Sequence, residues 1–202
     1  DDVKFLMDRK KYAPLITSKL DAGSIPLRVV HNDAKCSNIL LGNKNIVSGK
    51  YEWATVVDLD TVMPGSLLYD FGDIIRSNCS GGCAEDEIDA RKVKFDFNMF
   101  SHLMESFLDA CIAITTPLEV ELLHMAGFVI TYEQALRFLG DFLAGDVYYK
   151  LAPDSNSQLN LVRARTQIAL LRSMERSLDQ MQGAVRRKAD ALTSVKMETK
   201  EV

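Results

Sequence analysis

Three oxygen-bearing side chains stand in two short stretches of the sequence, in a pattern that could perform chemistry. Asp33 and Asn38 lie five residues apart in the segment 31–38, HNDAKCSN, which has the pattern HxDxxxxN. Asp58 directly follows an apolar pair, Val56 and Val57. Amide and carboxylate oxygens are hard ligands suited to a Mg²⁺ ion that also binds phosphate oxygens. We therefore expect Asn38 and Asp58 to hold the metal and the nucleotide phosphates, and Asp33 to accept a proton from an attacking hydroxyl.

Two further aspartates follow Asp58, and they receive different assignments. Asp60 lies two residues beyond Asp58, so the two carboxylates face the same way if the strand continues. We assign Asp60 to the metal site, with a turn cap as the alternative. Asp70 begins an Asp-Phe-Gly tripeptide, but it follows a turn at 63–65 and opens a helical pattern. We therefore assign the metal to Asp58 and a structural role to Asp70.

Short strands are expected to position these residues. Apolar and β-branched runs at 27–30, 38–41 and 54–57 predict strands, and a polar loop from Gly42 onward joins the last two. Such a hairpin would bring Asn38 and Asp58 together. A helix over about 3–20, ended by turn-forming residues, is expected to precede the strands.

The chain from residue 71 onward has helical patterns. Apolar residues recur on one face over 95–111. Thr116, followed by a proline and by Glu119, predicts a capping box that starts another helix. We expect that helix to run to Gly145, with a break near residue 131.

A last helix is expected over roughly 159–182, and the polar residues after Arg186 are expected to fray. These elements predict a mainly α (α+β) fold, a helical bundle with one small β-hairpin. We expect one domain over 1–185 and a polar tail over 186–202.

The composition is that of an ordinary globular protein and excludes several classes. The 202 residues are 47% hydrophobic and 26% charged, with a net charge of −4, which excludes a disordered, collagen-like or disulfide-scaffold protein. The sequence has no Lys/Arg-rich block, so we expect no nucleic-acid or membrane partner. Four cysteines without a signal peptide indicate reduced thiols and a cytoplasmic protein. Cys79 and Cys83 have no second Cys/His pair, so we expect no zinc there.

The motifs together resemble a known group of enzymes. HxDxxxxN followed by Val-Val-Asp is similar to the phosphoryl-transfer site of protein kinases and, more closely, to that of the aminoglycoside phosphotransferase/choline kinase family of small-molecule kinases. Segments 58–73 and 137–148 together look like the N-acetylhexosamine 1-kinase branch. The resemblance implies the C-terminal lobe of the protein-kinase-like fold, with ATP as co-substrate, Mg²⁺, and a small-molecule sugar as acceptor.

The resemblance also implies roles for the residues around the motif. Lys35 matches the lysine that touches the transferred phosphate, with an exposed surface lysine as the alternative. His31 is expected to be a packed structural histidine, and Asp70 the buried aspartate that braces the catalytic loop.

Arg137 and Tyr148 are implied as the sugar-binding residues. Arginine can donate to sugar hydroxyls or an acetamide oxygen, and tyrosine can stack on a pyranose ring or donate a hydrogen bond. In a continuous helix, eleven residues return to nearly the same face, although we expect Gly145 to interrupt it. A surface salt bridge for Arg137 and a half-buried aromatic for Tyr148 are the alternatives.

Kinases of this type also use a glycine-rich hairpin, a strand lysine and a glutamate that pairs with it. No GxGxxG and no GxxxxGK[ST] occurs in the sequence, and Gly81 and Gly82 lie in an acidic loop. With a first residue that is not methionine, we expect the chain to be the C-terminal lobe of a longer kinase, with the N-terminal nucleotide lobe absent. We expect this chain alone not to turn over.

Three hypotheses about function follow, of which an ATP-dependent kinase for the anomeric hydroxyl of an N-acetylhexosamine is the leading one. The second keeps the mechanism and changes the acceptor to choline, ethanolamine, homoserine or an aminoglycoside. A choline site favours aromatic cages and an aminoglycoside site favours many carboxylates, whereas the chain has one Trp and modest acidity. The third is a non-catalytic kinase-like interaction module, which has no need of a base and two metal ligands.

Overall fold

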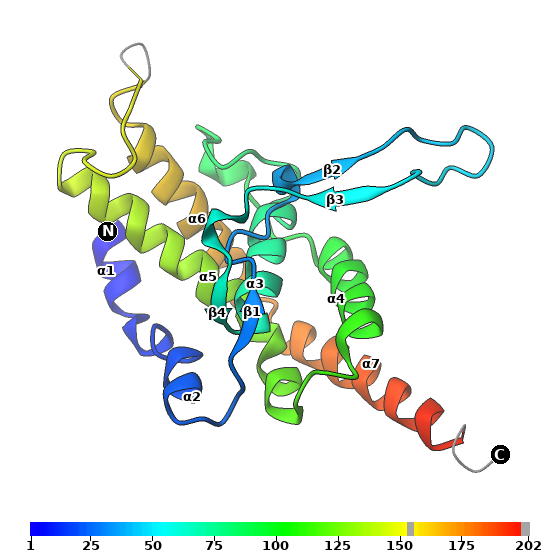
Figure 1. The fold of residues 1–202 in the computed structure, drawn as a ribbon. Helices are drawn as coiled ribbons and strands as arrows, with labels where there is room; N and C mark the ends of the chain where they lie inside the picture. The colour runs from blue at the N-terminus through cyan, green and yellow to red at the C-terminus, as the bar shows by residue number, and fades with distance from the viewer. Residues whose placement is uncertain (153–155, 199–202) are drawn as a thin grey trace.

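The structure, a computed structural model, describes residues 1–152 and 156–198 (Figure 1). It is mainly helical with two small antiparallel sheets, which confirms the fold class predicted from the sequence. The α-helices are α1 (Asp2–Met7), α2 (Thr17–Asp21), α3 (Leu67–Asn78), α4 (Phe97–Cys111), α5 (Pro117–Leu143), α6 (Leu159–Glu175) and α7 (Leu178–Glu198). The strands are β1 (Arg28–Val30), β2 (Ile39–Leu41), β3 (Ala54–Val56) and β4 (Met63–Gly65). Short 3-10 helices are η1 (Lys10–Tyr12), η2 (Cys36–Asn38), η3 (Leu59–Thr61) and η4 (Ala90–Lys92).

The four strands form two separate two-stranded sheets. β2 pairs with β3 through Ile39↔Val56, and this hairpin projects away from the helices (Figure 1). β1 pairs with β4, with Val29 opposite Pro64. The expectation that 63–65 is only a turn was wrong. Proline is compatible with this strand because a two-stranded sheet leaves the outer edge of each strand without a partner.

α3 and α5 pack unusually closely, which fixes one side of the functional site against the other. A Cβ on Gly72 would lie 2.6 Å from the backbone oxygen of Ala126, and one on Gly127 would lie 2.6 Å from Ile75 Cγ2. Both positions therefore need glycine. α3 also begins earlier than residue 71, because the Ser66 hydroxyl accepts a hydrogen bond from the Leu68 amide at 3.2 Å and caps the helix.

The core surrounds α5. α6 lies along α5, and α7 packs on α4 and α5. The largest fully buried side chains of the core are the rings of Phe71, Phe100, Phe128 and Phe138. This packing leaves the loops between β1 and α3 on one surface of the helical body, where they can carry the site.

The N-terminal region differs from the single helix expected over 3–20. It is divided into α1, η1 and α2. Pro14 lies between η1 and α2 and has no amide hydrogen to donate to a preceding carbonyl, so a continuous helix loses a hydrogen bond there. Apolar spacing alone does not reveal such an interruption, because it does not depend on backbone hydrogen bonding.

The capping box predicted at the start of α5 is confirmed: the Thr116 hydroxyl accepts from the Glu119 amide and the Glu119 carboxylate accepts from the Thr116 amide. Glu119 is fully buried and also pairs with Arg28, which ties β1 to this helix end. The break expected near Thr131 is absent. The Thr131 hydroxyl donates to the Gly127 carbonyl at 2.6 Å within an uninterrupted α5.

The last helix expected over 159–182 is two helices, α6 and α7, which meet near Ser177. α7 continues through Glu198, so residues 186–198 are helical where a frayed tail was expected. Its first half is held by buried Met181 and Val185. Residues 199–202 of the expected tail lie outside the described residues. Within the part of the chain that the structure describes, no helix is long and apolar enough to cross a membrane.

Candidate active site

The site is built on the loop between β1 and β2, which carries the HxDxxxxN motif and which we call the catalytic loop (residues 31–38). Its start is held by Asp70 on α3. The two Asp70 carboxylate oxygens accept hydrogen bonds from the backbone amides of His31 at 2.9 Å and Asn32 at 2.7 Å. Asn32 has a left-handed backbone with φ of 60°, which asparagine tolerates better than most residues. The turn into Asp33 is therefore fixed from α3.

The segment around η3 braces the same loop from the other side. The Thr61 hydroxyl donates to the His31 carbonyl at 2.7 Å, and the Asn32 side-chain amide donates to the Thr61 carbonyl at 3.2 Å. His31 Nε2 lies 3.0 Å from the Val57 carbonyl, which can only accept, so this ring nitrogen carries the proton. His31 is thereby a packed, hydrogen-bonded residue that joins the loop to the segment before η3.

Asp33 has one carboxylate oxygen engaged and one open. Lys35 Nζ donates to Oδ2 at 2.7 Å, and the Asn38 side-chain amide donates to the same oxygen at 2.9 Å. No residue that the structure describes donates to Oδ1. Burial raises the pKa of the Asp33 carboxyl, but the hydrogen bonds from Lys35 and Asn38 outweigh it and hold the pKa below its usual value. Asp33 is thus an ionised, oriented carboxylate with a free oxygen, as a general base requires.

Lys35 forms an ion pair with Asp33 and stays partly accessible. The hydrogen bond to Asp33 is the largest influence on its pKa, which it raises. The Lys35 side chain is 37% exposed. A cation here can contact both the base and a negatively charged group that approaches it.

The predicted metal ligands gather at the root of the β2–β3 hairpin. Asn38 is buried, and its carbonyl accepts from the Val57 amide at 3.0 Å, which places Asp58 beside the loop. The Asn38 side-chain nitrogen donates to Asp33, so its Oδ1 is left as an acceptor. Asp58 and Asp60 are exposed.

The carboxylates of Asp58 and Asp60 lie near each other, but not because both stand on one strand, as was assumed from the sequence. β3 ends at Val56, so the continuing strand assumed for them does not exist. Asp58 instead has a left-handed backbone, with φ of 67°, and caps η3, which contains Asp60. A hydrogen bond shared with Asp60, together with the repulsion of its charge, raises the pKa of Asp58.

These residues fit a magnesium site that is completed by the nucleotide. Two carboxylates that repel each other and one free amide oxygen are hard donors, which Mg²⁺ prefers. Among the described residues, no group of three or more His, Cys, Asp or Glu side chains could hold a metal by itself. The chain therefore offers part of a coordination shell, as is usual for Mg²⁺ bound together with substrate phosphates.

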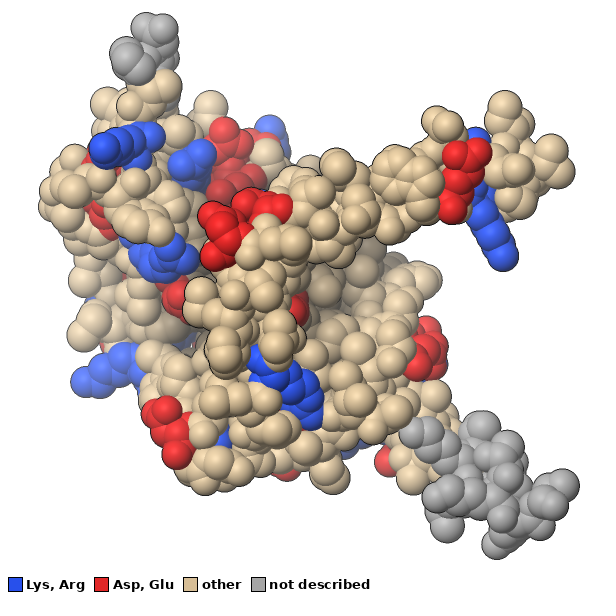
Figure 2. Space-filling view, viewed as in Figure 1, with Lys and Arg blue, Asp and Glu red and all other residues tan. Residues whose placement is uncertain are grey.

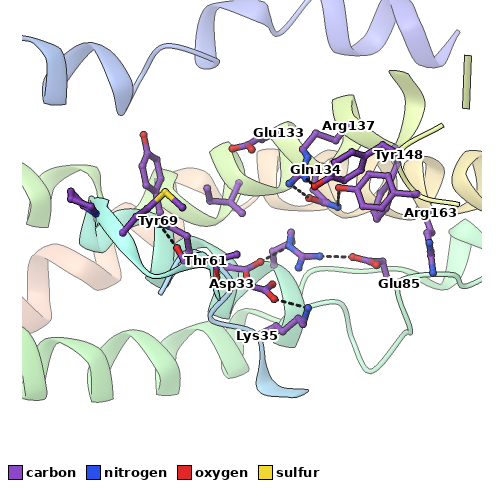
Figure 3. A pocket seen from close by; sticks show the side chains of 18 residues that line it. Asp33, Lys35, Thr61, Tyr69, Glu85, Glu133, Gln134, Arg137, Tyr148 and Arg163 are labelled. Atoms are coloured by element: carbon purple, nitrogen blue, oxygen red, sulfur yellow. Dashed lines mark hydrogen bonds and ion pairs between the residues drawn. The ribbon is translucent and has the colours of Figure 1, made fainter. Parts of the chain in front are cut away.

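A pocket of about 740 Å³ opens beside Asp33 and Lys35. In Figure 3 these two residues and Thr61 lie on one side of it, and Glu133, Gln134, Arg137 and Tyr148 lie on the other. The lining carries four carboxylates and four cationic side chains: Asp33, Asp73, Glu85 and Glu133 against Lys35, Arg76, Arg137 and Arg163. The pocket is polar but balanced in charge, and the face in Figure 2 likewise mixes both signs.

Both predicted sugar-binding residues line this pocket. Arg137 on α5 lies 3.5 Å from the Tyr148 hydroxyl, and its guanidinium is 5.5 Å from the centre of the Tyr148 ring. The helical geometry considered for the pair does not hold, because α5 ends at Leu143. Left-handed residues Gly145 and Asp146 turn the chain back toward the helix instead.

Asp141 fixes that return. Its two carboxylate oxygens accept the backbone amides of Tyr148 and Tyr149, each at 2.8 Å. Asn160 on α6 donates to the same carboxylate at 3.3 Å and to Asp146 at 2.9 Å. Tyr148 is therefore held against the pocket by a buried polar network.

Sequence reasoning missed a second network in the pocket wall. Arg76 on α3 donates to Asp73 at 2.7 Å and to Glu85 at 2.6 Å. Burial raises the pKa of Asp73, although Arg76 opposes the effect. The signal available was an Asp and an Arg three residues apart on one helix, a spacing at which side chains can meet. The loop that supplies Glu85 has no periodicity from which its position could be predicted.

Comparison with known protein families agrees with the catalytic-loop geometry. Residues 8–97 match the family described as the phosphotransferase enzyme family, abbreviated APH. The match includes Asp33, Asn38, Asp58 and Asp70 and ends before Arg137. No particular member is identified by it. Residues 8–97 are therefore similar to the phosphotransferase enzyme family, over less than half of the chain.

Proposed function

We propose that this protein transfers the γ-phosphoryl group of ATP to a small-molecule hydroxyl, most specifically the anomeric hydroxyl of an N-acetylhexosamine. The single observation that carries the proposal is the arrangement at Asp33. One carboxylate oxygen is held by Lys35 and Asn38, and the other is free beside a polar pocket. An acceptor hydroxyl in that pocket would meet an oriented base.

In the proposed reaction, the acceptor hydroxyl donates a hydrogen bond to Asp33 Oδ1 and gives up its proton as its oxygen attacks the γ-phosphorus. The bond between that phosphorus and the β,γ-bridging oxygen breaks, and ADP leaves. Lys35 stays beside the carboxylate and neutralises charge on the transferred group. Asn38 and Asp58, with Asp60 next to them, would hold Mg²⁺, which supplies charge stabilisation for the phosphate oxygens.

The pocket favours a neutral polyol over a cationic acceptor. Its carboxylates and cations are equal in number, so a trimethylammonium or polyamine group gains little net attraction. Arg137 offers N–H donors, and Tyr148 offers a hydroxyl and an exposed ring face, which together suit a hexose with an acetamido group. The choice of N-acetylhexosamine also rests on the resemblance of segments 58–73 and 137–148 to the kinases of that sugar.

The test is a phosphoryl-transfer assay on the protein with ATP and Mg²⁺. N-acetylglucosamine, N-acetylgalactosamine, glucose, choline, homoserine and an aminoglycoside are offered separately, and ³¹P NMR identifies the product. A sugar 1-phosphate, lost in Asp33→Asn and kept in the distant control Glu175→Gln, supports the proposal. Phosphoryl transfer only to choline, homoserine or the aminoglycoside would show that the acceptor is that compound and not an N-acetylhexosamine. Absence of transfer to all six would favour a non-catalytic module.

A further inference from the structure

The Asp73 carboxylate lines the pocket, and the proposed reaction gives it no role. It lies on α3 with 6% of its surface exposed, and its Oδ1 accepts a hydrogen bond from Arg76 Nε at 2.7 Å. Its Oδ2 is buried and receives no hydrogen bond from any residue that the structure describes. A buried carboxylate oxygen without a donor is costly, so a donor that enters with a ligand would relieve that cost.

Among the residues that the structure describes, Asp73 Oδ2 is the one fully buried carboxylate oxygen without a hydrogen-bond partner. Both oxygens of Glu175 are bound by Arg9, at 3.1 and 2.6 Å. Both oxygens of Asp141 accept backbone amides. An unpaired oxygen is thus peculiar to Asp73 among these three residues, and Asp73 alone of them lines the pocket that contains the candidate base.

Asp73 also lies within electrostatic reach of the candidate base. Burial and Arg76 are the main influences on its pKa, and the charges of Asp33 and Lys35 act on it as well. Arg76 also donates a hydrogen bond to Glu85 at 2.6 Å, so the guanidinium that orients the Asp73 carboxylate is held by two carboxylates. Two oriented carboxylates, Asp33 and Asp73, therefore line the same pocket.

We propose that Asp73 Oδ2 accepts a hydrogen bond from a second hydroxyl of the acceptor, while Asp33 Oδ1 receives the hydroxyl that is phosphorylated. Asp73 would then determine specificity by selecting acceptors with two correctly spaced hydroxyls. This inference rests on the proposed function, since it takes the acceptor to be a sugar bound beside Asp33. Because Oδ2 is covered in the structure, a neighbouring pocket side chain must move slightly for the hydroxyl to reach it.

The test measures sugar affinity by calorimetry on the 202-residue chain, without phosphoryl transfer. N-acetylglucosamine is compared with its 3-, 4- and 6-deoxy analogues in the wild type and in Asp73→Asn. The asparagine oxygen can keep the Arg76 contact, whereas its nitrogen replaces Oδ2 by a donor. We expect one analogue to bind the wild type about 10- to 100-fold more weakly than the parent sugar, as for a lost hydrogen bond to a charged group. In Asp73→Asn that difference should disappear.

Glu175→Gln is the matched control, because it alters an Arg-paired carboxylate away from the pocket. It should keep the wild-type pattern. Equal binding of all analogues by the wild type overturns the inference even if Asp73→Asn fails to fold. Discrimination that persists in Asp73→Asn also overturns it, and in both cases the sugar still binds, so the proposed substrate survives. Failure of every sugar to bind the wild type would remove the proposed substrate as well.

Discussion

Asp73 and Arg76, on the side of the catalytic loop proposed to face the acceptor, are each less than a tenth exposed, whereas Asp58 and Asp60, on the side proposed to hold the metal, are open to solvent. The acceptor-side residues line a pocket whose second wall is α5, and α3 is locked onto α5 at Gly72. The other side leads onto the β2–β3 hairpin, whose strand residues are all exposed.

In the proposed reaction, the chain completes the acceptor half of the site and leaves the metal half to its ligands. On the acceptor side, positions are set by ion pairs and buried amides before any substrate arrives. On the proposed metal side, a hydrogen bond with Asp60 and the repulsion of its charge raise the pKa of Asp58, so a cation brought with the nucleotide would relieve that repulsion. Substitutions on the two sides should therefore fail in different ways.

The largest effect is expected from Asp58→Ala. We expect it to abolish Mg²⁺-dependent nucleotide binding, because it removes a hard ligand and half of the repelling pair. Sugar binding should persist. Calorimetry with Mg-ATP and, separately, with N-acetylglucosamine measures both. Asp60→Ala should weaken nucleotide binding less; if Asp60→Ala is the more damaging change, the assignment of the metal to Asp58 is wrong.

Asp33→Asn should lower turnover by at least about 10²-fold with little change in ATP affinity, because it removes the base and keeps the shape of the side chain. Steady-state kinetics at saturating sugar provide the comparison. The amide oxygen of the variant can still accept hydrogen bonds from Lys35 and Asn38. Turnover near that of the wild type would exclude Asp33 as the base.

Asp70→Ala should lower the stability of the fold and should not directly affect the binding of Mg²⁺ or nucleotide. It leaves the amides of His31 and Asn32 without their acceptor, which costs about 1–3 kcal/mol of unfolding free energy. Urea unfolding followed by circular dichroism measures the loss. Loss of Mg²⁺-dependent nucleotide binding at full stability would instead identify Asp70 as a metal ligand.

The smallest effect concerns pH. The Asp33 pKa is lowered in the folded protein, so the charge of Asp33 stabilises the fold above its ordinary pKa, and this stabilisation is lost as pH falls through the lowered value. Lys35→Met removes one of the groups that lower this pKa. We expect the acidic limb of the kcat/KM profile to move to higher pH, and Lys35→Arg to restore it. An unmoved limb in Lys35→Met would show that another group sets it.

Much of the catalytic loop could be predicted from the sequence, because its chemistry is local. HxDxxxxN places Asp33 and Asn38 in one loop, and the strand before Asp58 predicted the hairpin that brings it near. The capping box at Thr116 was equally local. Each of these depends on residues a few positions apart.

The acceptor wall was harder to predict because its contacts join distant segments. Glu85 comes from an irregular loop and meets Arg76 only after α3 is packed. Tyr148 faces Arg137 through a left-handed turn held by Asp141, not through helical periodicity. The helix prediction over 3–20 did not take Pro14 into account, and Pro64 was assigned to a turn, whereas the effect of a proline depends on whether its missing amide would have had a partner.

The central claim is that the pocket beside Asp33 takes a neutral sugar, and binding to the 202-residue chain tests it most directly. Saturation-transfer NMR with N-acetylglucosamine and N-acetylgalactosamine, in the absence of ATP, measures it. We predict saturable binding that Asp58→Ala leaves intact and that Arg137→Ala weakens about tenfold or more, as a lost hydrogen bond from a charged group would. If neither sugar gives a saturation-transfer signal, or if Arg137→Ala and the wild type bind the sugars equally, the result would contradict the account.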